Sequence, residues 1–465
     1  MSDSGVASDQ AWSVEQHAIE PIPAGDRHGS PVELFRLWIG ANVNYLVLLT
    51  GALAVAQGLS LAGSLTAILA GNALGCIVVG LASIMGPRTG TAAIITSRTS
   101  FGQLGAVLPI FISTAAAIGW FSINSVIATE SLAKLLSMSG LPASPLLGAG
   151  AMLLVLAAEI LLAIYGHATI VAAERFIAVV LVVLFIGFAA FVLPQIPWGA
   201  AAAARPPAGT AAWLLVTGLV FSYPLSWTNF ASDYSRYLPE STPWRRIALA
   251  AGGGQFIALV FCETIGVLFA LALGGTLSDP VADLPRVLPT WYLVPFLLAI
   301  ILGSIATNVP NGYTAGLGLL ALRLPMGRIA SLLAIALATL AFRAFTLYYG
   351  HALDLYERWL GYILIWTGPW IAIVLVDHFR RGGRYDGADL MRWGAGRYWY
   401  GGGVRWQGLA AFLAGLCVSV LFSNSDLYAS ALMTRFLGGT DLSFEMGMLT
   451  AGSLYFLLVR GAPPD

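Results

Sequence analysis

Tryptophan and asparagine side chains recur at helical spacing inside apolar stretches of this sequence. Trp120 and Asn124 are four residues apart, and Thr307 and Asn311 repeat that spacing, so each pair lies on one face of a helix. An indole stacks on a flat heteroaromatic ring, and an amide both donates and accepts hydrogen bonds along the edge of such a ring. A lone residue of this kind usually packs between helices. Together with Trp227, the set predicts a site for a planar, polar ligand.

Two apolar stretches are interrupted near their middle. The stretch 34–57 contains Gly40 and Asn44 close together, and the stretch 210–236 contains Pro224. Proline removes a backbone donor and clashes with the preceding turn, which frees carbonyl groups at membrane depth. Interrupted helices at corresponding positions of two halves indicate a transporter built from inverted repeats, with its binding site at the breaks.

Three glutamates lie within apolar stretches, where a buried charge is costly and therefore predicts a function. Glu130 is followed one turn later by Lys134, and we expect these two side chains to pair near the outer membrane surface. Glu159 and Glu263 have no basic neighbour in the sequence. Because loss of solvent disfavours a charged carboxylate, both residues are candidates for proton coupling.

The overall composition is that of a membrane protein. Of 465 residues, 58% are hydrophobic and 10% are charged, and the formal net charge is zero. Soluble domains carry about 25% charged residues, so the missing water-facing surface must face lipid. These proportions exclude a soluble enzyme, a nucleic-acid-binding protein and a secreted disulfide scaffold.

Twelve membrane-spanning helices are expected, because one crossing takes about 20 apolar residues. The predicted fold is therefore all-α and polytopic, with two five-helix repeats of opposite orientation. The expected spans are 34–57, 61–85, 104–136, 144–165, 172–193, 210–236, 247–274, 289–321, 327–347, 356–376, 406–425 and 443–459. The expected regions are a polar tail (1–30), a transport core (31–376, with repeats 31–193 and 210–376), an arginine-rich loop (377–405), and two accessory helices with a short tail (406–465).

The distribution of basic residues predicts the orientation of these spans. With the N-terminus inside the cell, 17 of the 23 basic residues fall on the inner side, as expected for cytoplasmic loops. Both termini should therefore be cytoplasmic. Lys134 is the single lysine, and such a preference for arginine suggests a GC-rich bacterial genome and hence a bacterial inner membrane.

The sequence shows none of the common catalytic or nucleotide-binding patterns. It lacks a glycine-rich phosphate loop with its lysine, a His-Glu-x-x-His pair and a cysteine pair with metal spacing. We therefore expect neither an enzyme nor an ATP-driven pump, no cofactor, and no metal other than a coupling ion.

Several segments resemble the nucleobase:cation symporter-1 family, and more narrowly its purine-cytosine permease branch. They are GPRTG (86–90), SRTSFG (97–102), GW (119–120), YGHATIVAAERF (165–176), SWTNFASDYSRYLP (226–239) and TNVPNGYTAGL (307–317). The resemblance implies the five-plus-five inverted-repeat fold of the bacterial leucine transporter. It also implies import of a nucleobase, cytosine or a purine, by alternating access coupled to H⁺ or Na⁺.

The resemblance further implies roles for individual residues. Two tryptophans would stack on the ring faces and other groups would read the ring edge: Trp120 and Trp227, then Asn44, Asn124, Asn311 and the backbone at Ser226. The cation site would comprise Gly40, Val43, Gly303, Ala306 and Thr307. Sodium-coupled relatives tend to carry a hydroxyl residue at the position of Ala306. Because a hard cation needs several oxygen ligands, the alanine favours H⁺ slightly, and the ion stays open.

Three alternatives to a nucleobase symporter are open at this point. The substrate could be another planar ring compound, such as a hydantoin, allantoin or a vitamin pyrimidine. A membrane-embedded enzyme acting on lipids is disfavoured, because histidine and acidic residues do not cluster in the sequence. A passive channel is disfavoured, because the polar residues lie at mid-membrane breaks and not in rings along a pore. The oligomeric state is not predicted.

Overall fold

The computed structural model describes residues 19–165, 167–199, 209–275, 277, 279, 281–349, 352–424, 428–436 and 439–461. Two predicted features fall partly outside this range. The first 18 residues of the polar tail lie outside the described residues, as do the side chains at positions 165–175 of the YGHATIVAAERF segment.

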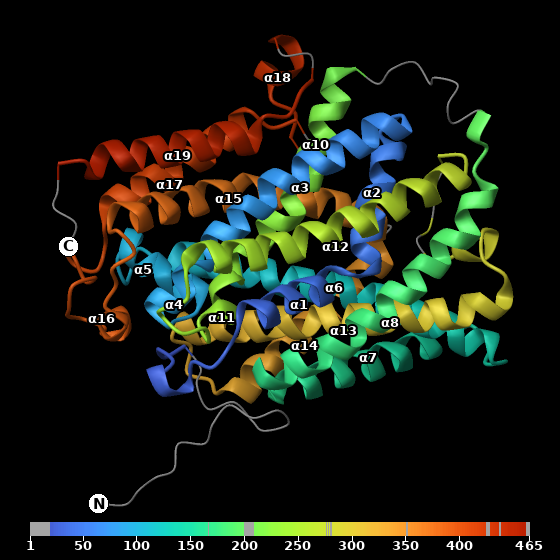
Figure 1. The fold of residues 1–465 in the computed structure, drawn as a ribbon, viewed down its shortest axis with the longest axis horizontal. Coiled ribbons are helices and arrows are strands. Elements are labelled where there is room, and N and C mark those ends of the chain that lie inside the picture. The colour runs from blue at the N-terminus through green and yellow to red at the C-terminus, as the bar shows by residue number, and fades with distance from the viewer. Residues whose placement is uncertain are drawn as a thin grey trace, which may run out of the picture.

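Long helices run roughly along one axis and form a single bundle (Figure 1). The first span is a bent pair, α1 (Pro31–Asn42) and α2 (Tyr45–Ala56). The other long helices are α3 (Leu61–Ser83), α6 (Val107–Met138), α7 (Pro145–Tyr165), α8 (His167–Val192), α10 (Thr210–Ser226), α12 (Trp244–Ala272), α13 (Thr290–Ala321), α14 (Arg328–Tyr349), α15 (Ala352–Arg380), α17 (Trp406–Leu421) and α19 (Ser443–Val459). Short elements between them are α4 (Met85–Thr89), η2 (Ala93–Thr96), α5 (Ser97–Phe101), η4 (Trp227–Asn229), α11 (Ala231–Ser235), α16 (Gly387–Met391) and α18 (Ala431–Phe436).

Each of the twelve expected spans corresponds to an apolar helix or bent helix pair, although the last two are short. Within the described residues, nine helices are long and apolar enough to cross a membrane, and the pair α1–α2, bent by 60°, forms a tenth span. Two shorter apolar helices, α17 and α19, follow. The predicted all-α polytopic fold is therefore confirmed. Helix α15 is longer than expected by four residues at each end, since it covers 352–380 where 356–376 is expected.

The break in the first span is made by the polar residues that interrupt its sequence. The Asn42 amide donates to the Trp38 carbonyl at 2.8 Å, in the last turn of α1. Asn44 then adopts an extended backbone, and its side-chain oxygen accepts the Val47 backbone N–H at 3.1 Å. This is an N-cap, which satisfies a donor that the start of a helix leaves unpaired. The same asparagine that interrupts the apolar pattern therefore begins α2.

The break in the sixth span lies beyond Pro224, not at the proline itself. Pro224 is inside α10, which continues to Ser226 before the chain turns through η4 into α11. The Ser222 hydroxyl donates to the Leu219 carbonyl at 2.6 Å, and the Ser226 hydroxyl donates to the Tyr223 carbonyl at 2.7 Å. These bonds satisfy two carbonyls close to the proline in sequence.

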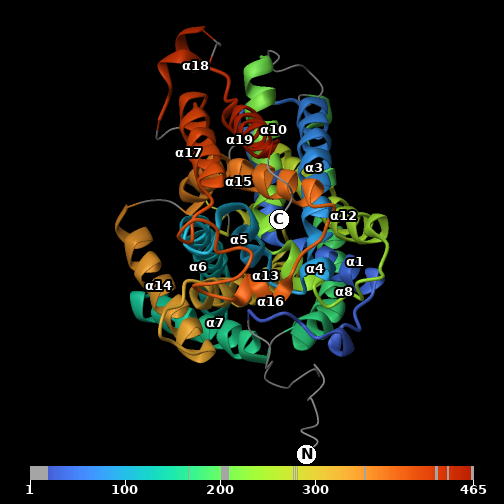
Figure 2. The same cartoon turned by 90° about the vertical axis from the view of Figure 1, so that its left-hand side faces the viewer.

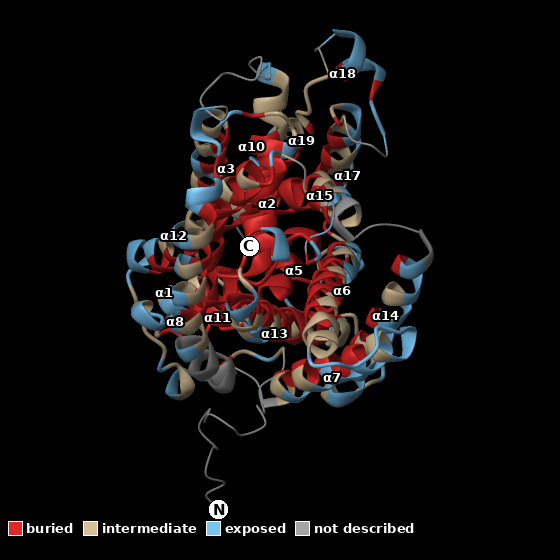
Figure 3. Cartoon of the chain, turned by 90° about the vertical axis from the view of Figure 1, so that its right-hand side faces the viewer, coloured by how far each residue is buried: buried red, intermediate tan, exposed pale blue. Residues whose placement is uncertain are grey.

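Helices α6 and α13 form the centre of the bundle. In their membrane-spanning windows 72% and 78% of residues are buried, compared with 28% in α8 and α14. Figure 3 shows the same arrangement, with buried residues in the middle and exposed residues on the outer helices. Side chains on α6 and α13 therefore face protein, whereas α8 and α14 present much of their surface to lipid.

One end of the bundle carries most of the short elements, namely α4, α5, α11 and α16 (Figures 1 and 2). The N-terminal segment docks here: the Ile22 N–H donates to the Gly90 carbonyl and the Gly29 N–H to the Tyr237 carbonyl, each at 2.9 Å. We call this end the N-terminal face and the opposite end, near α18, the far face.

Candidate substrate and cation site

The two broken spans meet α6 and α13 in the middle of the bundle. The Asn44 amide nitrogen lies 3.0 Å from the Thr307 hydroxyl and 3.3 Å from the Tyr223 hydroxyl. This single amide therefore connects the α1–α2 break with α13 and α10. The Trp120 ring of α6 packs edge-on against Tyr223, with ring centroids 5.3 Å apart. The structure thus brings together Asn44, Trp120 and Thr307, which are distant in the sequence.

The residues predicted to bind a cation lie where α1 contacts α13. The Thr307 hydroxyl is 3.0 Å from the Ala41 carbonyl and 2.9 Å from the Gly303 carbonyl. A Cβ atom on Gly303 would lie 3.5 Å from the Val43 carbonyl, so that carbonyl also faces α13. Ala41 was not among the predicted residues, although its carbonyl links α1 to Thr307 of α13.

Gly40 and Ala306 complete the predicted cation set and are buried in the same two helices. The methyl group of Ala306 offers no oxygen. The oxygens gathered here are thus the Thr307 hydroxyl and nearby backbone carbonyls. A hard cation binds through several oxygen ligands, so this set fits a sodium ion only if further oxygens, such as those of water, join it.

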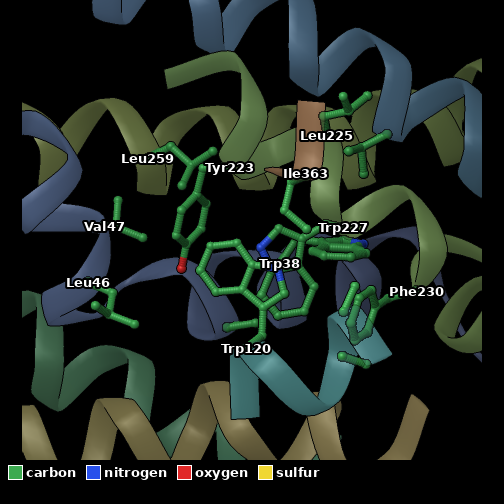
Figure 4. Close-up of a cluster of buried hydrophobic side chains, with 14 of the residues drawn as sticks. Trp38, Leu46, Val47, Trp120, Tyr223, Leu225, Trp227, Phe230, Leu259 and Ile363 are labelled. Atoms are coloured by element: carbon green, nitrogen blue, oxygen red, sulfur yellow. The ribbon is translucent and has the colours of Figure 1, made fainter. Parts of the chain in front are cut away.

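The two predicted stacking residues, Trp120 and Trp227, lie in one cluster of buried side chains (Figure 4). Trp120 packs against Tyr223 and against Tyr356, the latter with centroids 6.0 Å apart. Trp227 packs against Trp38, with centroids 5.4 Å apart and an interplanar angle of 86°. Each tryptophan is therefore held by its own aromatic neighbours.

Trp38 and Tyr223 are part of this cluster and were missed by the sequence analysis. Trp38 is fully buried in α1, and Tyr223 is 1% exposed. Both residues flank the interruptions of their spans: Trp38 is two residues before Gly40, and Tyr223 immediately precedes Pro224. This proximity to the breaks was the available signal.

Four buried polar atoms in this region have no hydrogen-bond partner among the described residues. Two are donors, the indole N–H groups of Trp38 and Trp120, and two are acceptors, the amide oxygens of Asn124 and Asn229. The amide nitrogens are occupied, since Asn124 donates to the Trp120 carbonyl at 2.9 Å and Asn229 to the Ser226 carbonyl at 3.3 Å. An unpaired buried polar group costs about 1–3 kcal/mol. Unpaired donors and acceptors beside aromatic rings make this region a candidate site for a polar ring.

Asn311 belongs to a hydrogen-bonded series that ends at a carboxylate. Its amide nitrogen donates to the Asn308 side-chain oxygen at 3.2 Å, and the Asn308 amide nitrogen is 2.8 Å from one Glu159 oxygen. The Ser125 hydroxyl donates to the other Glu159 oxygen at 2.7 Å. Glu159 is fully buried, and its carboxylate has no cationic partner within the described residues. The predicted proton carrier is therefore linked to a predicted substrate residue.

Glu263 lies in a different environment, between α12, α3 and α2. Within the described residues its carboxylate bonds to the Asn72 amide alone, and its second oxygen is unpaired. A Cβ atom on Gly51 would lie 1.9 Å from the Glu263 carbonyl, so α2 and α12 touch backbone to backbone here. Glu263 is thus outside the hydrogen-bonded series that contains Glu159.

The expected pair between Glu130 and Lys134 is wrong. Glu130 pairs instead with Arg343 of α14, with 3.0 Å between the guanidinium nitrogen and the carboxylate oxygen. A planar guanidinium from a neighbouring helix suits a partly buried carboxylate better than a flexible lysine on the same helix.

The central site is closely packed toward the N-terminal face. Asp233 of α11 accepts the Ala93 backbone N–H at 2.7 Å and also the Thr314 hydroxyl of α13. A Cβ atom on Gly86 would lie 2.1 Å from the Ser235 hydroxyl oxygen. The segment after the second span therefore packs directly on the end of the sixth.

Toward the far face, a cavity of about 400 Å³ lies between α10, α15 and the end of α2. Its lining includes Gln57, Gly218, Glu357 and Arg358. The Gln57 amide donates to Glu357 at 2.7 Å and so joins α2 to α15 at this cavity. The space in this half of the bundle contrasts with the close packing at the N-terminal face.

Comparisons with known proteins agree with this geometry. The family model described as "Permease for cytosine/purines, uracil, thiamine, allantoin" matches residues 21–447. YxlA of Bacillus subtilis, named as a candidate purine-cytosine permease, is 28% identical over 457 residues, which cover 96% of each chain. The purine-cytosine permease FCY2 of Saccharomyces cerevisiae is 25% identical over 484 residues, covering 96% of this chain and 86% of FCY2.

The fold also matches a solved structure along nearly its whole length. Mhp1, a nucleobase-cation-symport-1 family transporter in a closed conformation with bromovinylhydantoin bound, superposes with a TM-score of 0.80 and 19% identity, covering 96% of each chain. At 19% identity the similarity to Mhp1 supports the fold alone. Membership of the family is shown by the family model, which matches residues 21–447. The chain therefore belongs to the cytosine/purine permease family of nucleobase:cation symporters.

Proposed function

We propose that this protein is a secondary active symporter that imports a nucleobase, cytosine or a purine, by alternating access. The observation that carries the proposal is the set of unpaired indole N–H groups and amide oxygens beside the rings of Trp38 and Trp120. A nucleobase presents two aromatic faces and an edge with both donors and acceptors. Such a ring would pair these atoms and stack on the indoles.

Residue roles follow from this arrangement. Trp120 and Trp227 stack on the ring, Asn124 and Asn311 read its edge, and the Ser226 carbonyl adds a backbone acceptor. Asn44, the sixth residue of the proposed set, already bonds to three groups in α1, α10 and α13. Its contact with substrate therefore requires exchange of one of these bonds, which would couple substrate binding to the helix break.

The coupling ion is H⁺ or Na⁺ in this proposal, and the local chemistry favours H⁺. The cation region, formed by Gly40, Val43, Gly303, Ala306 and Thr307, lacks the second hydroxyl. A buried carboxylate, Glu159, is connected through two asparagines to the substrate region. Glu263 is the second candidate for the proton.

The membrane orientation is also a proposal. Arginines dominate the segment that follows α15 on the N-terminal face, as is typical of cytoplasmic loops. Both termini are thus assigned to the cytoplasm of a bacterium, and the cavity at the far face would open to the outside.

A second substrate class is another planar ring compound. The family description includes thiamine and allantoin, and Mhp1 was solved with bromovinylhydantoin. Hydantoin, allantoin and vitamin pyrimidines each present an amide-like edge that could pair with Asn124.

Uptake into proteoliposomes tests the proposed function. Labelled cytosine, adenine, hydantoin and allantoin are offered with an imposed proton gradient, a sodium gradient or neither. We expect accumulation of a nucleobase above the outside concentration with one of the two gradients, and its loss when an ionophore dissipates that gradient. Uptake that only equilibrates, with every ring and every gradient, would show a passive pathway and refute a symporter.

A further inference from the structure

A groove of about 520 Å³ runs between α3 and α12 on the outside of the bundle. It is lined by apolar side chains and glycines for most of its length. Ile77 of α3 and Leu249 of α12 form part of the lining and are 60% and 73% exposed. Since both helices are membrane spans, this exposed apolar surface faces lipid.

Close contact between the two helices forms the floor of the groove. A Cβ atom on Gly80 would lie 2.7 Å from the Ala248 carbonyl, and one on Gly252 would lie 2.5 Å from the Cys76 carbonyl. The backbones therefore touch, and the missing side chains leave a furrow above the contact. Gly253 also lines the groove, and a Cβ atom there would meet one neighbour, the Phe35 ring at 4.0 Å, and no backbone atom within that distance.

The groove ends in positive charge at the N-terminal face. Its last lining residues are Trp244 and Arg245, which begin α12. Arg245 and Arg246 are exposed, and neither makes an ion pair or side-chain hydrogen bond within the described residues. The Arg245 guanidinium lies 5.4 Å from the Trp244 ring centre. Tryptophan and arginine are the residues that favour the headgroup level of a membrane.

The length of the groove corresponds to one leaflet. From Trp244 to Phe256, α12 rises about 18 Å at the helical repeat, and half of the hydrocarbon core is about 15 Å. The groove is therefore about as long as the acyl chain of a lipid. Two unpaired arginines lie at its end, at the level where the phosphate of such a lipid would be.

We propose that this groove binds an anionic phospholipid from the leaflet on the N-terminal face. One acyl chain lies along the α3–α12 furrow, and the phosphate contacts Arg245 and Arg246. The proposal is independent of the transported substrate, because no residue of the central site lines the groove.

Native mass spectrometry of the full-length protein tests this site. The protein is purified from membranes or nanodiscs that contain equal amounts of phosphatidylglycerol and phosphatidylethanolamine, and the retained lipid is identified by mass. We expect preferential retention of one phosphatidylglycerol. The preference for phosphatidylglycerol should fall about fivefold in Arg245→Gln, because this is the effect of removing one positive charge near an anionic headgroup. It should fall by about the same factor again when Arg246→Gln is added.

Two further variants keep the test specific. Gly253→Leu fills the groove without touching the neighbouring backbone, so retention of both lipids should fall while substrate binding persists. Arg384→Gln removes an exposed arginine in the segment after α15, which does not line the groove, and should change nothing. Equal retention of the two lipids by the wild-type protein would overturn the proposal. So would a dimer of the chain that forms without lipid and is lost in Gly253→Leu, because a second copy would then cover the groove.

Discussion

The Asp377 cluster at the end of α15 and the central site are both buried and polar, but they differ in how their hydrogen bonds are satisfied. The Asp377 carboxylate accepts from Arg381 at 2.7 Å, from Arg405 at 3.1 Å and from Tyr455 at 2.7 Å. Arg405 also donates to the Thr99 carbonyl at 2.9 Å. These bonds join α15 and α5 to the two accessory helices, since Arg405 precedes α17 and Tyr455 lies in α19.

In contrast to the Asp377 cluster, the central site contains several polar atoms without a hydrogen-bond partner. The indole N–H groups of Trp38 and Trp120 and the Asn124 amide oxygen have no partner within the described residues. Buried polar groups are normally satisfied, so each exception needs an explanation, and a bound ligand is one of these. The comparison therefore separates a region whose polar groups are paired across several helices from one whose polar groups are unpaired, and we propose that the unpaired groups bind the ligand.

The largest expected effect is on stability, at Asp377. Asp377→Asn leaves Arg381 and Arg405 buried without a counter-charge, so the free energy of unfolding should fall by about 3–5 kcal/mol. Thermal unfolding of the purified protein, followed by intrinsic fluorescence, measures this change. Glu240→Gln is the matched control, because it removes an exposed pair with Arg88 at 3.7 Å that contributes about 0–1 kcal/mol. Equal shifts for both variants would show that the cluster does not hold the fold.

The next effect concerns ion coupling. Each proton that crosses the membrane potential supplies about 2.3 kcal/mol per 100 mV for accumulation of substrate. We expect Glu159→Gln to abolish accumulation driven by a proton gradient, while substrate exchange persists. Glu263→Gln should retain accumulation, because its carboxylate bonds to Asn72 outside the substrate region. Paired uptake and exchange assays distinguish the two. The reverse pattern would assign the proton to Glu263, and steep sodium dependence at fixed pH would contradict both assignments.

Substrate affinity should change by a smaller amount at the stacking residues. Trp120→Ala and Trp227→Ala should each weaken binding by about 1–3 kcal/mol, the range for base–aromatic stacking. Equilibrium binding of labelled nucleobase to purified protein measures the loss. Trp291→Ala is a suitable control, because Trp291 is 69% exposed. If neither variant weakens binding, these tryptophans serve packing only.

The smallest expected effect is a change in selectivity at Asn124. Replacement by Ser or Gln moves or removes one edge contact, and a single hydrogen bond is worth about 0.5–1.5 kcal/mol. Competition assays with a panel of bases should therefore show a reordered preference of several-fold. A uniform loss that preserves the order would mean that Asn124 does not read the ring edge.

The spans and the first break were predictable because their signals are local. Long apolar runs specify the helices, and Asn44 both interrupts the apolar pattern and caps the following helix. The second break was harder to place. Pro224 marks it in the sequence, but the helix continues past the proline to Ser226.

Contacts between distant segments were not predictable from the sequence. Glu130 selects Arg343, which is 213 residues away, because a different helix brings that guanidinium within reach. Trp38 and Tyr223 were hidden among 14 tryptophans and 16 tyrosines, and only their contacts in the folded chain, Trp38 with Trp227 and Tyr223 with Trp120, distinguish them. Which polar atoms lack a partner is likewise a property of the folded chain.

The central claim is that the unpaired atoms beside Trp38, Trp120 and Asn124 recognise the polar edge of a planar ring. Calorimetric binding of a nucleobase and of an apolar ring of the same size to the purified protein tests it most directly. A site built for hydrogen bonds rejects an analogue that lacks them by about 10⁴-fold, so the nucleobase should bind and the apolar ring should show no measurable affinity. Similar affinities for the two rings would contradict the account.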